Sequence, residues 1–162
     1  MKDRSRLIEE ARGVCASTHV PVAILCAIIE TESNWNRYAT RYEPLFNYET
    51  TPEKFAKLNR ITVQTEKQMQ KMSWGLGQVM GATARAIGYS GPLPALCETL
   101  ENMYWTCKYL KQKLDKYDSL DEVISAYNAG SAKRYPKFNA SDKDVFMNQK
   151  YVDKVTAALA NY

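Results

Sequence analysis

Apolar residues recur every three or four positions along most of this chain, the spacing that places them on one face of an α-helix. A first stripe predicts a helix that ends near His19; its residues are Leu7, Ile8, Ala11, Val14 and Cys15. The longest stripe follows Pro94 and consists of Leu96, Leu100, Met103, Cys107, Leu110, Leu114 and Tyr117. We interpret it as a central core helix in preference to a coiled coil, and the chain is therefore predicted to be all-α.

A second helix is predicted to begin at Pro21, because a proline at the first helical position sacrifices no hydrogen bond. Helical spacing then puts Glu32 on the same face as three large aliphatic side chains, those of Leu25, Ile28 and Ile29. Glu30 points to the opposite side of this helix. An apolar face is an unusual place for a carboxyl group, which makes Glu32 a candidate for chemistry.

The helical period disappears between residues 38 and 49, where Pro44 stands among aromatic residues. We interpret this segment as an irregular flap or a small β-hairpin near residues 39–50, with aromatic side chains available to a ligand. Directly after it, Thr50 and Glu53 have the spacing of a capping box, which predicts a short helix to about Leu58.

Further helices are predicted over residues 66–72, over 79–87 with Gly88 as the stop, and over 151–159. Another is predicted between a capping box at Ser119 and Glu122 and a stop at Gly130. The segment 73–78 interrupts this pattern. Since no repeat or linker divides the chain, residues 1–162 are predicted to form a single domain.

Composition excludes several classes of protein. With 45% hydrophobic and 25% charged residues, the chain resembles a globular domain and not a disordered one. Its longest uncharged apolar run, 20–29, is far shorter than the roughly 20 residues that span a bilayer, so no integral membrane association is expected. The four cysteines fit no zinc spacing, so we expect no metal site and predict buried free thiols at Cys15, Cys26, Cys97 and Cys107.

Several kinds of chemistry are also disfavoured. The net charge of +4 comes from scattered residues without a nucleic-acid-binding motif. The only histidine, His19, has no nucleophile setting, and Gly75-Leu76-Gly77 lacks the remaining residues of a phosphate loop. Glu32 remains as the candidate for chemistry. Burial would raise its pKa, as a general acid requires. Alternatively, the carboxyl group lies at the edge of the apolar stripe and reaches water.

Two further segments offer surfaces that suit a sugar. Ser73 to Met80 places two glycines, the Gln78 amide and a thioether close together, and Ala126-Tyr127-Asn128-Ala129-Gly130 places an aromatic ring and an amide at a helix end. Together with Glu32-Ser33 and Tyr151-Val152, in this order, they resemble the soluble lytic transglycosylases, relatives of goose-type lysozyme. The bacteriophage branch is resembled most by Arg41-Tyr42-Glu43-Pro44, Ser73-Trp74-Gly75 and Gly91-Pro92-Leu93.

The resemblance implies a lysozyme-like helical fold that cleaves the β-1,4 bond between N-acetylmuramic acid and N-acetylglucosamine in peptidoglycan, without a cofactor. Glu32 matches the family's catalytic acid and base. Residues at substrate-binding positions are Ser33, Gln78, Met80, Tyr127, Asn128 and Tyr151. The chain departs from the family at Gly77, where many members have Met, and at Arg41, where some have a serine that contacts the substrate's acetamido group.

In the implied reaction, Glu32 protonates the bridging oxygen and then removes the proton of the muramic acid 6-hydroxyl, which closes a 1,6-anhydro ring. Two alternatives stay open. A muramidase would use water and a second carboxylate, for which Glu43 or Glu49 is the candidate; Glu43 could instead orient Glu32 or Arg41. The chain could also be an inactive peptidoglycan-binding module of a virion.

The first residues lack the apolar segment of a secretion signal. We therefore expect a monomeric enzyme made in the host cytoplasm. It would reach the periplasmic cell wall either as an endolysin, through a membrane lesion, or as part of a virion. Its expected partner is the glycan strand of peptidoglycan, and no nucleic acid partner is expected.

Overall fold

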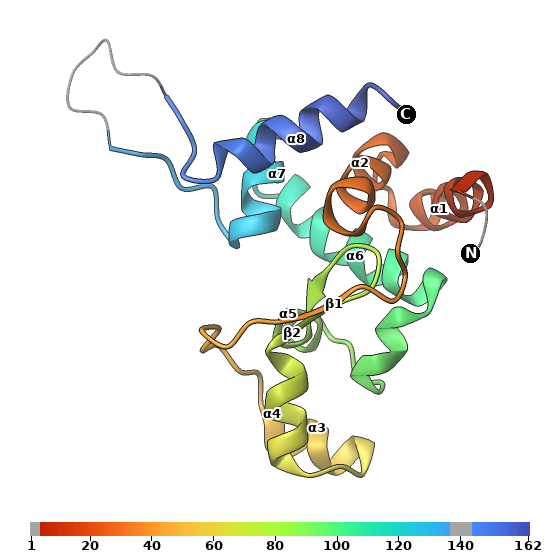
Figure 1. Ribbon diagram of the computed structural model, residues 1–162, viewed down its shortest axis with the longest axis vertical. Helices are drawn as coiled ribbons and strands as arrows, with labels where there is room; N and C mark the ends of the chain where they lie inside the picture. The colour runs from red at the N-terminus through yellow and green to blue at the C-terminus, as the bar shows by residue number, and fades with distance from the viewer. Residues whose placement is uncertain (1–3, 137–143) are drawn as a thin grey trace.

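The computed structural model describes residues 4–136 and 144–162 and folds them into helices around a small sheet (Figure 1). The α-helices are α1 (Arg4–Thr18), α2 (Val22–Ser33), α3 (Pro52–Asn59), α4 (Val63–Gln70), α5 (Gly81–Ala86), α6 (Thr99–Leu114), α7 (Leu120–Ala129) and α8 (Gln149–Leu159). A 3-10 helix, η1, covers Leu93–Cys97, and the strands are β1 (Thr40–Tyr42), β2 (Met72–Trp74) and β3 (Val79–Met80). The predicted mostly helical, lysozyme-like class is confirmed.

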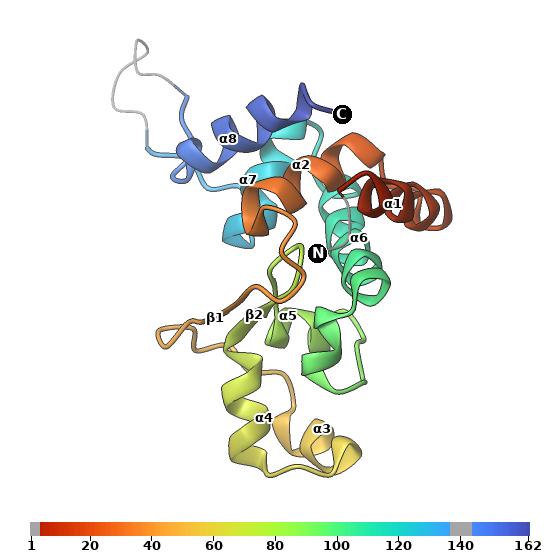
Figure 2. The same ribbon diagram turned by 45° about the vertical axis from the view of Figure 1, so that its right-hand side comes forward.

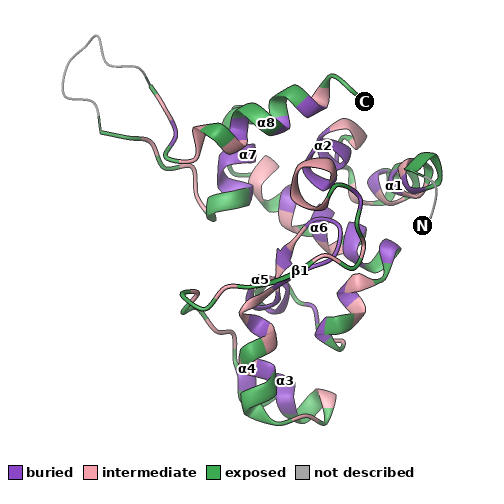
Figure 3. Cartoon of the chain, viewed as in Figure 1, coloured by how far each residue is buried: buried purple, intermediate pink, exposed green. Residues whose placement is uncertain are grey.

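Two clusters of buried side chains divide the fold into two lobes. In the larger lobe, α1, α2, α7 and α8 pack around α6, with Leu25, Ile28 and Met103 among the buried residues. In the smaller lobe, β2, β3, α5 and η1 surround Trp74 and Leu93. Figure 2 shows the helices of the larger lobe at the top, β1, β2 and α5 below them, and α3 and α4 at the bottom. Figure 3 shows the buried residues on the inward faces of the helices.

The helix predicted after Pro94 is two helices. Pro94 lies in the first turn of η1, and the backbone becomes extended at Glu98 before α6 begins. The break changes which residues of α6 face inward: Leu100 is 56% exposed, whereas the polar residues Asn102 and Thr106 are completely buried. The predicted apolar stripe is therefore wrong at Leu100, but it is correct at Leu96, which is buried in η1, and from Met103 onward.

The hairpin predicted near residues 39–50 is also wrong in its pairing. β1 pairs antiparallel with β2, Thr40 opposite Trp74 and Tyr42 opposite Met72, and β2 pairs with β3. The hairpin is thus β2–β3, and β1 joins it across about thirty residues of sequence. Because residues 79–80 are a strand, the helix predicted from Val79 begins only at Gly81.

One predicted capping box is confirmed and one is wrong. Ser119 and Glu122 cap α7 reciprocally. Thr50 does not cap α3: its hydroxyl donates to the Ala82 carbonyl at 3.1 Å, and α3 begins at Pro52 after Thr51. The Thr50 side chain therefore joins the flap to α5 instead of starting a helix. The helix predicted over 66–72 begins earlier, at Val63, with Thr62 as its cap.

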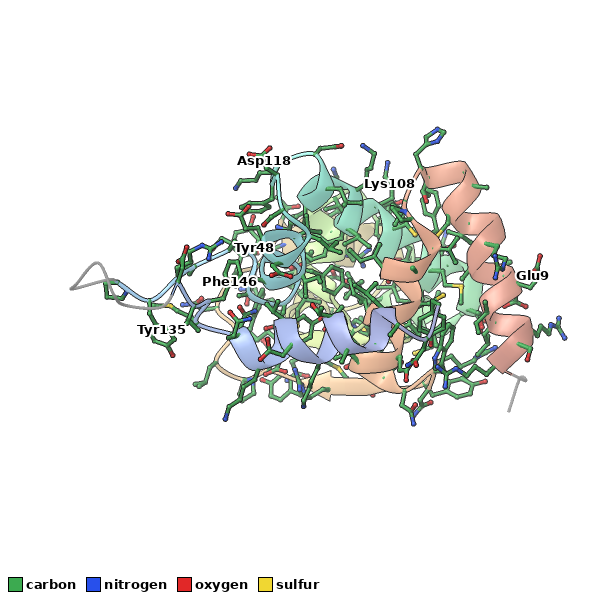
Figure 4. The ribbon with its side chains drawn as sticks, turned by 90° about the horizontal axis from the view of Figure 1, so that it is seen from above. Glu9, Tyr48, Lys108, Asp118, Tyr135 and Phe146 are labelled. Carbon is green, nitrogen blue, oxygen red and sulfur yellow. The ribbon has the colours of Figure 1, made fainter. Side chains whose placement is uncertain are left out.

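The surface of the larger lobe separates polar from apolar residues as expected. From above (Figure 4), Glu9 and Lys108 point away from α1 and α6, whereas Phe146, beside the start of α8, is buried. Cys15, Cys26 and Cys107 are buried as predicted, and Cys97 is half-buried. Among the helices of the described residues, none has the length and apolarity to cross a membrane.

Candidate active site

A cavity of about 490 Å³ lies where side chains of both lobes meet. Its wall is built from α2, the flap after β1, the β2–β3 hairpin, α5, α6 and the end of α7. The lining residues are Glu32, Arg41, Glu43, Leu45, Phe46, Ser73, Gln78, Val79, Met80, Thr83, Tyr109, Tyr127, Asn128, Ala129 and Gly130. Six predicted site residues therefore meet in one cavity: Glu32, Glu43, Gln78, Met80, Tyr127 and Asn128.

Glu32 lies in the last turn of α2, just before the chain leaves the helix. The backbone turns away through two consecutive left-handed residues, Asn34 at φ 48° and Trp35 at φ 64°. The Tyr151 hydroxyl of α8 donates to Glu32 Oε1 at 2.6 Å. Burial raises the pKa of Glu32, and the Tyr151 hydrogen bond and the positive charge of Arg41 oppose that rise. The carboxyl group is thus desolvated, oriented and open to the cavity on one side.

Glu30 faces away from the cavity, as predicted. Its carboxylate accepts hydrogen bonds from Arg4 Nη2 at 2.6 Å and from the Tyr162 hydroxyl. Tyr162 also accepts a hydrogen bond from the Trp35 indole at 3.1 Å. Glu30 therefore joins α1, α2 and the C-terminal residue, and the two glutamates of one helix serve different parts of the molecule.

The Gly75–Gln78 turn, whose last residue lines the cavity, is held in place by Asn102 of α6. The Asn102 amide donates to the carbonyls of Trp74 and Leu96 at 2.8 and 2.7 Å, and its oxygen accepts from the Gly77 N–H at 2.8 Å. Asn102 is completely buried. The sequence reading missed this residue, because an asparagine inside an apolar stripe gives no signal for the turn that it binds.

Gln78 does not offer its amide to a ligand in the way that the sequence suggested. Its Nε2 donates to the carbonyls of Ala39 and Gly75, both at 2.8 Å, and its Oε1 accepts from the Ser73 hydroxyl at 2.8 Å. Both amide hydrogens are therefore used inside the protein. Gln78 lines the cavity, but its polar atoms connect the hairpin to the chain before β1.

Tyr127 and Asn128 close the cavity from α7. The Tyr127 hydroxyl donates to the Gly77 carbonyl at 2.6 Å, and its ring lies 5.2 Å from that of Tyr109. Asn128 Oδ1 accepts from the Asn148 amide at 3.0 Å, so Asn128 is held in place while it lines the cavity. Tyr127 thus links the larger lobe to the hairpin of the smaller one.

The other predicted residues are divided between the cavity and its surroundings. Tyr151 reaches the cavity only through Glu32, and the Ser33 hydroxyl donates to the Ile29 carbonyl of its own helix at 3.2 Å. Glu43 lines the cavity, whereas Glu49 lies outside it with Lys67 at 3.5 Å. Phe46 of the flap lines the cavity, as expected of the flap's aromatic residues. Sequence reasoning missed Tyr109 and Thr83, neither of which lies in a recognisable motif. Among the described residues, no three His, Cys, Asp or Glu side chains gather as a metal-binding group.

Burial of Glu32 predicts a pH-dependent cost in stability. Because the pKa of Glu32 is raised from its ordinary value of 4.5 in the folded protein, the charged form is disfavoured there. This loss of stability is present at pH values above the pKa of Glu32 in the folded protein. It is absent at pH values below the pKa of Glu32 in the unfolded chain. We expect Glu32→Gln to raise the melting temperature by a few degrees at pH 7, with the difference vanishing near pH 4. A difference independent of pH would contradict this account.

Position 77 has no space for a side chain. A Cβ there would overlap Oγ1 of Thr106 and approach Cγ2 of the same residue to 2.7 Å. We expect Gly77→Ala to lower the free energy of unfolding by about 1–3 kcal/mol. The double variant Gly77→Ala with Thr106→Ala should recover part of the lost free energy of unfolding. Gly13→Ala is the control, because a Cβ at Gly13 meets nothing within 4 Å, and it should be neutral or stabilising. Thermal and urea unfolding measure these effects; an unaffected Gly77→Ala would refute the packing argument.

Comparison with known proteins agrees with this geometry. The sequence matches the family described as Transglycosylase SLT domain over residues 13–148, which is most of the chain. No solved structure matched the chain. The match includes Glu32, the β2–β3 hairpin and the end of α7, the segments that form the cavity. The chain therefore belongs to the SLT transglycosylase family and is a peptidoglycan lytic transglycosylase, an enzyme that cleaves glycosidic bonds.

Proposed function

We propose that Glu32 is the single acid and base of this enzyme and that the product is a 1,6-anhydro-muramic acid end. The observation that carries the proposal is the setting of Glu32: a buried carboxyl group with a raised pKa that opens onto the cavity and is held by Tyr151. A raised pKa keeps the proton on this carboxyl group to a higher pH than on an ordinary glutamate, which is the direction that a general acid needs.

The reaction needs one proton to leave Glu32 and one to return. Protonated Glu32 gives its proton to the glycosidic oxygen between N-acetylmuramic acid and N-acetylglucosamine as the bond to C1 breaks. The acetamido group of the muramic acid unit stabilises the positive charge at C1. The Glu32 carboxylate then takes the proton of the 6-hydroxyl, and O6 bonds to C1. No water is consumed, and Glu32 ends protonated.

Tyr151 supports both states of this cycle. Its hydroxyl donates to Oε1 of Glu32, which fixes the carboxyl group and leaves Oε2 for the substrate. Burial also raises the pKa of Tyr151 far above its usual range, so the phenol stays protonated and remains a donor. Phe46, Tyr109 and Met80 supply the apolar walls on which sugar rings can lie.

The surroundings of the other acids support a single-carboxylate mechanism. Glu43 lines the cavity but forms an ion pair with Arg41, and Glu49 forms one with Lys67. A water-using muramidase with Glu43 as second carboxylate is thus the competing function, and the two differ in product.

Digestion of purified peptidoglycan in ¹⁸O-water separates the two reactions. We expect unlabelled anhydro ends, identified by mass spectrometry as lighter than hydrolysed ends by one water. Glu43→Gln and Glu49→Gln should give the same product. Label at C1 of the muramic acid ends, without anhydro species, would refute the proposal and establish hydrolysis.

We also propose that residues 1–162 act as one monomeric domain of a bacteriophage enzyme, an endolysin or a virion-carried transglycosylase. The support is the resemblance of the segments Arg41–Pro44, Ser73–Gly75 and Gly91–Leu93 to the phage branch. If the enzyme acts from a virion, it must be present in purified particles. A search for its tryptic peptides in particles and in lysates would decide between the two roles.

A further inference from the structure

Arg41 is the cation of the cavity. Of the residues that line it, only Glu32, Glu43 and Arg41 are carboxylic acids or bases, and Arg41 alone is basic. It lies on β1, whose three residues are all exposed, opposite Ser73 of β2. Its side chain is 73% exposed even though its Nε forms an ion pair with Glu43. The guanidinium group therefore stands at the cavity wall in contact with water.

The terminal edge of this guanidinium group has no partner in the part of the chain that the structure describes. Glu43 takes Nε, and no hydrogen bond or ion pair there joins either Nη atom. The contrast is Arg85, whose Nε and both Nη atoms bond to Glu66, Tyr89 and Gly91. Two parallel N–H groups on one edge of a guanidinium match the two oxygens of a carboxylate.

Glu43 orients this edge and balances part of the charge. The ion pair at Nε restrains the long Arg41 side chain, which lowers the entropy lost when a ligand binds. Glu32, the other acid in the cavity, has its pKa raised by burial, so its repulsion of an incoming anion is reduced. The neighbouring Leu45 and Phe46 carry no charge that would compete for the guanidinium group.

We propose that the terminal edge of Arg41 is a subsite for a carboxylate carried by the muramic acid unit of the glycan strand. This inference rests on the proposed function, because that function supplies the glycan. Muramic acid bears a lactyl group, whose carboxylate is free in peptide-free strands. In native strands the lactyl group is amide-linked to a stem peptide that has carboxylates of its own. A neutral N-acetylglucosamine polymer has neither, so this subsite favours muramyl glycans over chitin-like chains.

The test measures affinity by calorimetry in the Glu32→Gln protein, where turnover does not consume the ligand. Four ligands are compared: peptide-bearing strands, peptide-free strands, peptide-free strands with carboxylates converted to methylamides, and chitotetraose. We expect Arg41→Gln to weaken binding of a carboxylate-bearing strand about tenfold, the value of one charge-assisted pair. Arg41→Gln should leave the affinity for the methylamide strands and for chitotetraose unchanged. A loss for peptide-free strands alone identifies the lactyl carboxylate, and a loss for peptide-bearing strands alone identifies a carboxylate of the stem. A loss for both means that the guanidinium edge accepts either carboxylate.

Three variants isolate the role of the guanidinium group. Arg12→Gln is the matched control, since Arg12 is exposed and pairs with Glu9 at 3.6 Å on α1, and it should change no affinity. Arg41→Gln alone leaves the Glu43 carboxylate without its cation. The double variant Arg41→Gln with Glu43→Gln removes that carboxylate as well, and the tenfold loss of affinity should persist. Arg41→Lys keeps the charge without the two-pronged edge and should lose only part of the affinity.

Two results would overturn the subsite. Equal weakening of neutral and anionic ligands would mean that Arg41 shapes the cavity, and unchanged affinity for carboxylate-bearing strands would mean that it binds no carboxylate. Neither result depends on the product of the reaction. Conversely, labelled hydrolytic ends in ¹⁸O-water would refute the single-acid mechanism and leave the affinity comparison valid.

Discussion

Glu32→Gln is expected to lower the rate of peptidoglycan cleavage by at least about 10²-fold, the low end of what a general acid and base contributes. Glutamine keeps the size of the side chain and an oxygen that accepts the Tyr151 hydrogen bond, which is 2.6 Å long in the unsubstituted protein. It removes the transferable proton and the carboxylate that receives one. The geometry should survive while the chemistry stops. Turbidity loss of purified cell walls and release of soluble fragments measure the effect.

Glu30→Gln is the control from the same helix. Its side chain points away from the cavity to Arg4 and Tyr162, and a glutamine oxygen can still accept from both. We expect cleavage near the level of the unsubstituted protein, with any loss confined to the melting temperature. If Glu32→Gln cleaves cell walls and Glu30→Gln does not, the assignment of the acid is wrong.

Asn102→Leu is expected to lower the free energy of unfolding by about 3–5 kcal/mol, the largest stability effect that we predict. The leucine has the same branched shape, with two methyl groups in place of the amide, and leaves the Gly77 N–H and the carbonyls of Trp74 and Leu96 without their partner. Each buried polar group that loses a hydrogen bond costs roughly 1–3 kcal/mol. Since these groups fix the turn whose last residue lines the cavity, activity should fall with stability.

Urea unfolding of Asn102→Leu beside Asn47→Leu provides the comparison. Asn47 is exposed in the flap, so its substitution should change the free energy of unfolding by less than about 0.5 kcal/mol. A small effect for Asn102→Leu would mean that the turn keeps its shape through Gln78 and Tyr127 alone.

Local patterns predicted what depends on neighbours in sequence. Glu32 lies on the buried face of α2, and Ser119 caps α7, because helical periodicity and capping act within a few residues. The end of α7 and the β2–β3 hairpin meet Glu32 at one cavity. Their common role was predicted from the family resemblance and not from local patterns.

Pairings across long stretches of sequence could not be predicted in this way. β1 pairs with β2, and the Gln78 amide reaches back to Ala39, because the fold brings these segments together. Thr50 has the spacing of a cap, yet its hydroxyl finds the Ala82 carbonyl. In each case a polar group with a local option takes a distant partner, and a single sequence carries no sign of that choice.

The space that Gly77 shares with Thr106 bears on how this enzyme can diverge. The two residues are 29 positions apart, yet a side chain at one occupies the volume of the other. A larger residue at position 77, such as methionine, fits this backbone only when Thr106 of α6 is displaced or replaced by a smaller residue. Positions 77 and 106 should therefore change together in descent. A lineage that enlarges the first before shrinking the second must pass through a less stable ancestor, which restricts the order in which the two mutations can become fixed.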